Sequence, residues 1–277
     1  MDIITKEYVR KTIQKLKRPV DSYKNDYGRV LIMAGSPGMA GAAVLCGTSA
    51  LKTGSGLVKY CVPDAVRDVL QVAVPEATCL PRNPAAVRGS FEAAAAGPGL
   101  GDVDADKEIL KTLFSEFKGT LVLDADGLND IVRFGIAEEL KAARPSVIIT
   151  PHEGEAARML RVSELISREK TALELCEKFN VITVLKGYET LIADQKGRMS
   201  INKETGNPGM ATGGSGDVLT GIIASLAGQG LTPWQAAETG VYLHGYAGDI
   251  CAEEIGQAGM LAGDICRAIP KAMKDNL

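Results

Sequence analysis

The sequence has no apolar run long enough to cross a membrane and no large excess of charge of either sign. A membrane-spanning helix needs about 18 or more apolar residues in succession. The N-terminal segment MDIITKEYVRKTIQKLKRP is charged throughout, so it lacks the apolar core of a signal peptide. The formal net charge is −3 over 277 residues, which gives no general attraction to nucleic acid or to an acidic membrane. We therefore expect a cytoplasmic protein in which any phosphate-bearing ligand binds a local site.

The sequence also has no closely spaced pair of cysteines and only two histidines. The six cysteines, at positions 46, 61, 79, 176, 251 and 266, form no C-x-x-C pair. We interpret them as small buried apolar side chains rather than as a metal cluster or a disulfide framework. The two histidines are His152 and His244. We expect His244 to pack within a C-terminal helix.

Neither of the standard phosphate-binding loops is present. No G-x-x-x-x-G-K-[ST] motif occurs, and GPGLGD at 97–102 does not have the G-x-G-x-x-G spacing. This disfavours a P-loop NTPase and a Rossmann dehydrogenase.

What the sequence does have is a series of short apolar runs that alternate with helical patterns. Continuous hydrophobicity is typical of parallel strands that are covered on both faces. The stretches 104–117 and 168–179 between such runs have the spacing of amphipathic helices. We predict an α/β fold with a mostly parallel sheet, helices on both faces, and a ligand beyond the C-terminal ends of the strands. The runs lie at 29–36, 56–63, 92–101, 120–129, 146–155 and 181–190.

The pattern changes after residue 190. Residues 190–209 alternate in hydrophobicity and have a turn at 195–197, which predicts an antiparallel hairpin at the edge of the sheet. Further along, Thr232, Pro233 and Gln235 have the order of a capping box at the start of a helix. No linker, repeat or low-complexity tract interrupts the chain, so we expect one domain over residues 1–277.

A glycine-rich loop precedes an apolar helix in MATGGSGDVLTGIIASLAGQG, residues 210–230. Gly213, Gly214 and Gly216 let backbone N–H groups approach a ligand, and the free N–H groups at the helix start add to this anion site. Helix capping alone accounts for Asp217 near a helix start, but it does not require three glycines. The other interpretation makes Asp217 a base that takes a proton from a substrate hydroxyl, while the N–H groups bind the phosphoryl charge.

This order of glycine loop, aspartate and helix resembles the ribokinase-like superfamily, in which the aspartate is the catalytic base of phosphoryl transfer. Together with the other motifs, the chain resembles the ADP/ATP-dependent NAD(P)H-hydrate dehydratase family over nearly its whole length. The resemblance implies a repair lyase that dehydrates the S epimer of NADH or NADPH hydrate at the expense of ADP or ATP. We expect phosphorylation of the ring hydroxyl followed by elimination of phosphate. The matching segments are 24–58, 96–101, 123–129, 150–160, 184–194 and 207–230.

The resemblance also implies roles for individual residues, with Asp217 as the base of the first step. Without it, these positions have structural explanations as well: a strand-end lysine, a tight turn, close helix packing or a structural histidine. The implied nucleotide site consists of Lys186, Gly187, Tyr188, Glu189, Thr190, Gly213, Gly214, Ser215 and Gly216. The implied hydrate site consists of Ala42, Ala43, Gly99, Gly101, His152 and Asp217.

One motif departs from the wider superfamily. Many ribokinase-like kinases have N-x-x-E, whose glutamate helps to organise magnesium, whereas residues 152–155 read HEGE. The missing asparagine argues against a typical sugar or vitamin kinase and leaves the metal role of Glu155 open. We expect Mg²⁺ to accompany the nucleotide phosphates, held mostly through water. Asp124, Asp126 and Asn129 follow a strand, where they either position a water or a metal or simply end the strand.

The resemblance has consequences for partners. Some relatives carry an additional N-terminal epimerase domain, and residues 1–28 before the first expected core strand are too few for one. We therefore expect a stand-alone dehydratase, a separate epimerase as its metabolic partner, and a homotetramer. Two other functions stay open: a vitamin-precursor kinase of the same fold, which makes a stable phosphorylated product, and a non-catalytic nucleotide sensor, against which the intact Asp217 and its glycines argue.

Overall fold

The apolar runs of the sequence form the strands of one ten-stranded sheet in the computed structural model, which describes residues 1–277. The order across the sheet is β1-β10-β9-β8-β7-β6-β5-β2-β3-β4. Strands β2 to β8 are parallel, and β9 is antiparallel to both of its neighbours. The strands are β1 (Asp2–Ile3), β2 (Arg29–Met33), β3 (Leu57–Val62), β4 (Thr78–Pro81), β5 (Ala93–Ala96), β6 (Thr120–Leu123), β7 (Ser146–Ile149), β8 (Ile182–Leu185), β9 (Leu191–Ala193) and β10 (Met199–Ile201).

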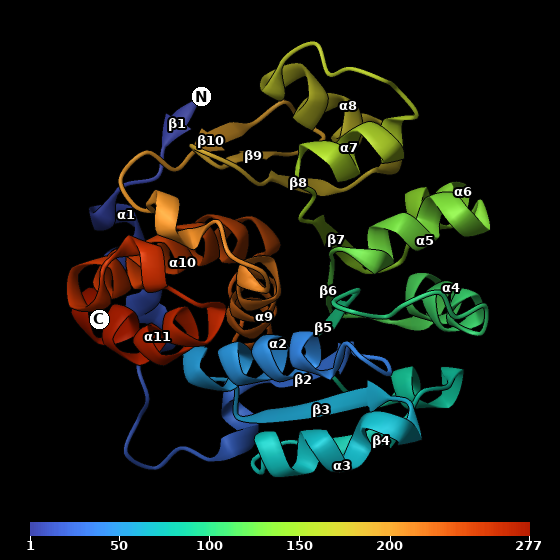
Figure 1. Ribbon diagram of the computed structural model, residues 1–277, viewed down its shortest axis with the longest axis horizontal. Coiled ribbons are helices and arrows are strands. Elements are labelled where there is room, and N and C mark those ends of the chain that lie inside the picture. The colour runs from blue at the N-terminus through green and yellow to red at the C-terminus, as the bar shows by residue number, and fades with distance from the viewer.

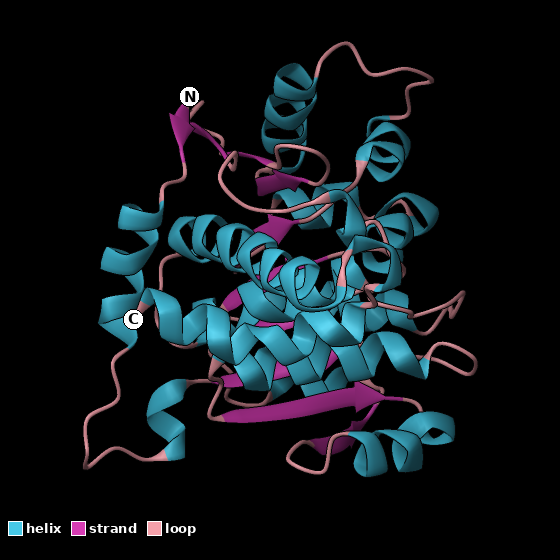
Figure 2. Ribbon diagram, turned by 60° about the vertical axis from the view of Figure 1, so that its left-hand side comes forward, coloured by secondary structure: helices cyan, strands magenta, loops and turns pink.

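Helices cover both faces of this sheet (Figures 1 and 2). One layer contains α1 (Lys6–Ile13), α2 (Ala40–Thr53), α3 (Asp64–Ala73), α9 (Ser215–Gly228), α10 (Pro233–Ile255) and α11 (Ala262–Asn276). The other contains α4 (Asp106–Glu116), α5 (Asp126–Phe134), α6 (Ala137–Lys141), α7 (Glu153–Leu160) and α8 (Arg168–Phe179). Short 3₁₀ turns lie at Gln14–Leu16, Lys24–Tyr27, Pro84–Arg88, Pro208–Met210 and Gln257–Gly259.

Each central strand contributes to two apolar cores, one on each face of the sheet. In β2, Val30 and Ile32 face the 46-residue core under α2 and α9, whereas Leu31 and Met33 face the 32-residue core under α4 to α8. The four alanines of β5 divide between the cores in the same way. Burial on both faces explains why these strands read as continuous apolar runs rather than as an alternating pattern.

The chain reverses its direction of travel across the sheet between β2 and β5. From β2 it moves outward through β3 to β4, and then it returns to β5 and proceeds through β6 and β7 on the other side. The loops after β2 and β5 therefore leave the sheet side by side at its C-terminal edge. In open α/β sheets such a switch point is the usual place for a ligand.

The predicted fold class is confirmed: the sheet is mostly parallel and is flanked by helices, and all six predicted runs contain strands. The hairpin is also confirmed, as β9 and β10 with a turn at 195–197, but β1 pairs outside β10 and is the edge strand. Helix α8 matches the predicted 168–179, and Thr232 caps α10 in a capping box with Gln235.

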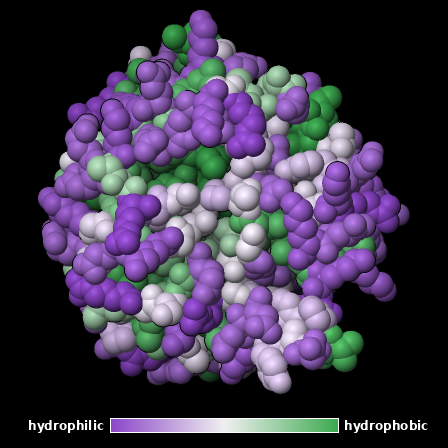
Figure 3. All heavy atoms as spheres, turned by 180° about the vertical axis from the view of Figure 1, so that it is seen from behind, coloured by the Kyte–Doolittle hydropathy of each residue, from purple (hydrophilic) through white to green (hydrophobic).

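No helix is long and apolar enough to cross a membrane. On the face of the molecule shown in Figure 3, hydrophilic side chains cover most of the surface, and hydrophobic residues show between them in smaller patches.

Gly97 is a position where the fold depends on the absence of a side chain. It follows β5 with φ +138°, and a Cβ there would lie 1.7 Å from the carbonyl oxygen of Asp124. We predict that Gly97→Ala lowers the free energy of unfolding by about 3 kcal/mol or more, because a backbone clash adds to the strain of positive φ. Chemical denaturation measures the loss.

Gly197→Ala is the matched control for this prediction. Gly197 also has positive φ, +76°, but a Cβ there has no neighbour within 4 Å. Its loss should be about 1 kcal/mol, from backbone strain alone. Equal losses in the two variants would show that the contact between the β5 and β6 loops is not what excludes a side chain at Gly97.

Candidate active site

The glycine loop forms the N-terminus of α9, and Asp217 lies in its first turn without capping it. Gly214 is the N-cap residue with φ +90°, and no side chain caps this helix. The Asp217 carboxylate accepts no hydrogen bond from the protein. In contrast, Asp264 at the same position of α11 accepts one from the backbone N–H of Leu261 at 2.8 Å. Capping therefore does not explain the presence of Asp217.

A buried ion pair between β6 and β8 lies beside this loop. The Lys186 Nζ is 2.5 Å from Asp124 Oδ1 and 3.7 Å from Glu155 Oε2. The other oxygen of Asp124 accepts a hydrogen bond from the Thr220 hydroxyl at 2.8 Å, from one turn further along α9. A Cβ on Gly216 would lie 3.3 Å from the Lys186 Nζ, so the glycine loop lies next to the ion pair.

Lys186 compensates the charge of Asp124 more fully than that of Asp217. Burial alone would raise the pKa of Asp124, but the Lys186 charge and hydrogen bonds from Lys186 and Thr220 outweigh it and hold that pKa below its ordinary value. Burial raises the pKa of Asp217 to about 7, with a further contribution from the negative charge of Asp124 that Lys186 only partly offsets. Asp217 is thus a carboxyl group that exchanges its proton near neutral pH.

The turn that follows β6 joins this cluster to the loops at the switch point. Ala125, between the two aspartates, has φ 48° and ψ −120°, a strained conformation for a residue with a side chain. Asp124 thereby faces Lys186, while Asp126 Oδ2 accepts a hydrogen bond from the Gly101 N–H at 3.0 Å. Asp126 also raises the pKa of Asp217. The two predicted half-sites therefore meet at the Asp124–Asp126 turn.

The predicted hydrate-site residues after β2 and β5 lie against each other. A Cβ on Gly99 would lie 2.9 Å from the Ala42 Cβ, and one on Gly101 would lie 3.1 Å from the Ser36 hydroxyl oxygen. Gly99 and Gly101 both have positive φ. Ala43 is fully buried under Gly35 and packs in the core. The Ala43 side chain faces the protein interior rather than the loop surface. The predicted contact of Ala43 with the substrate is therefore a prediction for its backbone atoms.

The predicted nucleotide loop 186–190 connects β8 to β9. Gly187 lies against the Arg168 guanidinium, which donates to the Leu185 carbonyl at 3.0 Å and so supports the loop from behind. The Thr190 hydroxyl donates to the Gly187 carbonyl at 3.1 Å. The Tyr188 side chain projects outward and is 89% exposed.

Both histidines contact the site, in different ways. His152 is the N-cap of α7: its Nδ1 accepts hydrogen bonds from the N–H groups of Gly154 and Glu155, and the Glu155 carboxylate accepts one from the His152 N–H. His244 lies in α10, as expected, but its Nε2 is 3.2 Å from the hydroxyl of Ser215 in the glycine loop. Burial lowers the pKa of His244 to about 4, so this imidazole is neutral at physiological pH.

The sequence interpretation did not name Thr220 as part of the cluster. It stands three residues after Asp217, so the two share one face of α9. This helical spacing was available in the sequence, but the partner Asp124 is 96 residues away and only the fold brings it near.

No group of three or more histidine, cysteine or carboxylate side chains is placed to hold a metal ion. Mg²⁺ commonly binds through nucleotide phosphates and water with one or two carboxylates. Asp126 keeps one oxygen without a hydrogen bond and fits that smaller role. Glu155 fits it less well, because its carboxylate is already bonded to the His152 N–H and lies near Lys186.

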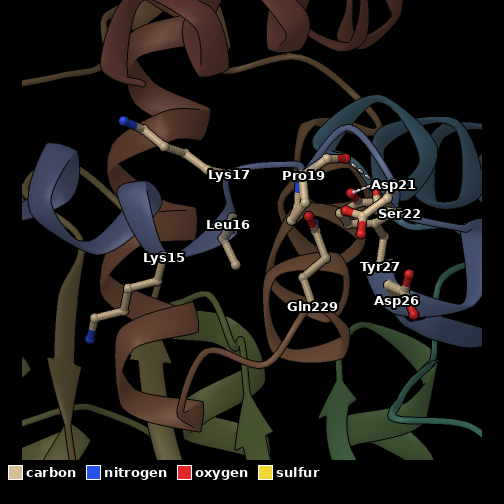
Figure 4. Close-up of a pocket in the computed structure, with 9 residues that line it drawn as sticks. All are labelled: Lys15, Leu16, Lys17, Pro19, Asp21, Ser22, Asp26, Tyr27 and Gln229. Carbon is tan, nitrogen blue, oxygen red and sulfur yellow. Dashed lines mark hydrogen bonds between the residues drawn. The ribbon is translucent and has the colours of Figure 1, made fainter.

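A surface pocket near the N-terminus is separate from this cluster (Figure 4). Its lining includes Gln229, which follows the last residue of α9, so the 14-residue helix separates it from Ser215 by about 20 Å. In Figure 4, Lys15 and Lys17 point away from the group around Pro19 and Ser22. None of the predicted site residues lines this pocket.

The fold and the cluster define a ribokinase-like α/β protein with a carboxylate beside a phosphate-type glycine loop. A family model described as NAD(P)H-hydrate dehydratase matches residues 30–271. The chain belongs to this family.

Individual relatives agree with this assignment. The chain is 37% identical to the ADP-dependent (S)-NAD(P)H-hydrate dehydratase of Neisseria meningitidis, over 91% of this chain and 86% of that protein. It is 40% identical to the bifunctional NAD(P)H-hydrate repair enzyme Nnr of Moorella thermoacetica, over 94% of this chain. The chain spans about half, 52%, of the length of that bifunctional relative.

The fold of this chain is also similar to that of a solved structure. The ADP/ATP-dependent NAD(P)H-hydrate dehydratase of Bacillus subtilis, co-crystallised with ATP and Mg²⁺, superimposes with a TM-score of 0.88 at 30% identity. The match covers 100% of this chain and 99% of that one.

Proposed function

We propose that this chain dehydrates the S epimer of NADH or NADPH hydrate to the working cofactor and consumes ADP or ATP in doing so. The observation that carries the proposal is the state of Asp217. Its carboxylate accepts no hydrogen bond from the protein, its pKa is raised to about 7, and it lies beside a glycine loop at a helix N-terminus. A general base is most effective when its pKa is near the working pH.

In the first step Asp217 takes the proton of the ring hydroxyl, whose oxygen bonds to the terminal phosphorus of the nucleotide. The bond from that phosphorus to its bridging oxygen breaks, and the nucleotide leaves with one phosphate fewer. The N–H groups of 213–216 and the Lys186 ammonium stabilise the charge on the transferring group. Kinase-type geometry thus converts a poor leaving group, hydroxide, into a good one.

In the second step the ring nitrogen pushes out the phosphate. The carbon–oxygen bond breaks, and a proton leaves the neighbouring carbon to restore the double bond. The products are NADH or NADPH, inorganic phosphate and AMP or ADP. Water must be kept from the cationic intermediate, and the loops at 34–42 and 97–101 are the proposed surface on which the dinucleotide lies.

Mg²⁺ would bind with the nucleotide phosphates and one oxygen of Asp126, where it would neutralise charge on the phosphates. The co-crystallisation of the Bacillus subtilis relative with ATP and Mg²⁺ supports the use of Mg²⁺ with the nucleotide. The proposed nucleotide contacts are the loops 186–190 and 213–216, and the proposed hydrate contacts are Ala42, Ala43, Gly99, Gly101, His152 and Asp217.

The wider setting is also a proposal. The bifunctional relatives combine repair activities in one longer chain. We propose that a separate epimerase supplies the S epimer to this chain in the cytoplasm, and that the chain forms a homotetramer. Sedimentation of the purified protein measures the last of these.

Turnover should depend on the ionised form of Asp217. Because the base must be deprotonated, kcat/KM should rise with pH through a midpoint of about 7 and level off above it. Asp124→Asn should move this midpoint to lower pH, because it removes a negative charge that raises the Asp217 pKa and frees Lys186 to approach Asp217. A pH–rate profile of both proteins measures the shift.

Asp194→Asn is the control for this profile, since Asp194 is buried in the β9–β10 turn and pairs with Arg198. Its midpoint should match that of the wild type. A wild-type midpoint near the ordinary aspartate pKa of 3.8 would contradict the proposed role of Asp217.

Recovery of the reduced-nicotinamide absorbance tests the proposed function. Purified hydrate is incubated with the protein and with ADP or ATP in parallel, and the S epimer should be consumed with release of free phosphate. If the absorbance is recovered neither with ADP nor with ATP, the proposal is refuted. A stable phosphorylated product without recovery would instead favour a small-molecule kinase of the same fold.

A further inference from the structure

Arg82 has a buried guanidinium and belongs to none of the motifs that form the candidate site. It follows β4, and its side chain is 5% exposed. Its Nε donates to Asp106 Oδ1 at 2.7 Å, and its Nη2 bonds to the other oxygen of the same carboxylate, which is fully buried at the start of α4. This fork leaves other donors of the guanidinium free for further acceptors.

Those donors connect the two loops at the switch point. The Nη1 of Arg82 donates to the Gly35 carbonyl at 3.0 Å, and the Nη2 donates to the Leu100 carbonyl at 3.1 Å. Gly35 follows β2 and Leu100 follows β5, so one side chain ties together the loops that the proposed function assigns to the hydrate. The Gly35 N–H donates to the Pro98 carbonyl at 2.8 Å and completes the link.

The hydrogen bond from Arg82 to the Gly35 carbonyl also fixes the direction of the Ser36 backbone N–H. In a trans peptide the carbonyl of one residue and the N–H of the next point in opposite directions. With the Gly35 carbonyl held by Arg82, the Ser36 N–H points away from the guanidinium, and it donates to no acceptor in the protein. The uncapped N-terminus of α2 follows a few residues later and adds further donors.

We propose that Arg82 is a positioning residue of the hydrate site. It holds loops 34–39 and 97–101 at one spacing, so that backbone N–H groups meet the pyrophosphate of the dinucleotide while Gly99 and Ala42 stay in contact. Arg82 does not touch the reacting atoms and lies on the side of the sheet switch point away from the nucleotide loop 186–190. This inference rests on the proposed function, because that function places the hydrate on these loops.

Arg82→Lys tests the inference. Lysine keeps the charge opposite Asp106, but one ammonium cannot reproduce the planar fork that reaches both carbonyls. We expect the KM for the hydrate to rise about tenfold and the affinity for the product NADH to fall by a similar factor, as the loss of charge-assisted hydrogen bonds predicts. The KM for ADP and kcat at saturation should stay within about twofold to threefold. Steady-state kinetics and calorimetric titration with NADH and ADP give these values.

A second variant tests the same inference if Arg82→Lys does not fold. Replacing a buried ion pair with apolar side chains of similar volume often leaves stability unchanged or higher. The double variant Arg82→Met with Asp106→Leu should therefore fold, while lacking both bonds to the loop carbonyls. It should show the same rise in the hydrate KM.

Arg88→Lys is the matched control. Arg88 also makes a forked pair with a carboxylate of α4, Glu116, at 2.8 and 3.0 Å, but it is exposed and touches neither loop. It should leave every constant unchanged. Folded Arg82 variants with an unaltered hydrate KM and NADH affinity, or with equal changes for hydrate and ADP, would overturn the inference. Failure of the wild type to recover NADH from the hydrate would instead refute the proposed function and, with it, the basis of this inference.

Discussion

Asp217→Asn is expected to lower kcat by about a hundredfold or more, because asparagine cannot accept the proton of the substrate hydroxyl. The affinity for ADP should stay close to that of the wild type, since the N–H groups of the glycine loop are unchanged. Single-turnover kinetics and nucleotide titration separate these two quantities.

The same variant, Asp217→Asn, should be more stable than the wild type at neutral pH although it is less active. The folded-state pKa of Asp217 is raised, so its ionised form is disfavoured in the fold, and the stability present below pH 4 is lost as pH rises through about 7. A neutral asparagine removes that loss, and the melting temperature at neutral pH should rise. A drop in activity together with a gain in stability is the mark of a residue kept for chemistry.

Asp264→Asn provides the control for a general helix effect. Asp264 has the same position in α11, but there it caps the helix and pairs with Arg267. Its substitution should lower stability and leave kcat unchanged. Wild-type turnover by Asp217→Asn would show that Asp217 is not the base.

Lys186→Met should cause the largest loss of stability among changes at the site. Its ammonium compensates the fully buried Asp124 and lies near Glu155. Removing one partner of a buried pair leaves an uncompensated charge and costs about 3–5 kcal/mol. The pKa of Asp217 should also rise, because Lys186 lowers it. Denaturation at neutral pH without nucleotide measures the first effect, and the pH–rate profile measures the second.

Lys203→Met is the corresponding surface control. Lys203 pairs with Glu189 at 3.4 Å, but its side chain is 44% exposed. An exposed pair contributes about 0–1 kcal/mol, so this loss should be small. Similar losses for Lys186→Met and Lys203→Met would show that the buried pair does not hold the site together.

Much of the fold was predictable because its strands are buried on both faces. Continuous apolar runs such as 29–36 and 120–129 identify strands of a parallel sheet, and α8 was readable from its apolar spacing alone. Strand β1 has two residues and is exposed, and β4 is a four-residue strand at the other edge, so neither forms an apolar run. Strand order was not readable, because pairing depends on contacts between distant segments.

The candidate site was predictable where one short segment carries the chemistry. The glycines and Asp217 are adjacent in the sequence, so their shared location required no fold. The pairing of Asp124 with Lys186 and Thr220, and the bonds of Arg82 to two loops, join residues far apart in the chain and follow no local motif. The raised pKa of Asp217 likewise arises from burial and from Asp124, which only the fold brings together.

The switch point and the glycine loop give the proposed function two separate places for its two phosphate-bearing molecules. The loops proposed for the nucleotide lie around Lys186 and α9, and the loops proposed for the hydrate lie after β2 and β5. The Asp124–Asp126 turn connects them through Lys186 on one side and the Gly101 N–H on the other. This arrangement places Asp217 near the boundary between the two loop groups, as transfer of a phosphoryl group between two bound molecules requires.

The fate of the ring hydroxyl oxygen tests the central claim most directly. Hydrate carrying a heavy oxygen isotope at that hydroxyl is converted by the wild-type protein with unlabelled ADP or ATP, and the released phosphate is analysed by mass spectrometry. Phosphorylation followed by elimination predicts that the labelled oxygen appears in inorganic phosphate, with one phosphate released for each NADH or NADPH recovered. Label released into water while the cofactor is recovered would contradict the account.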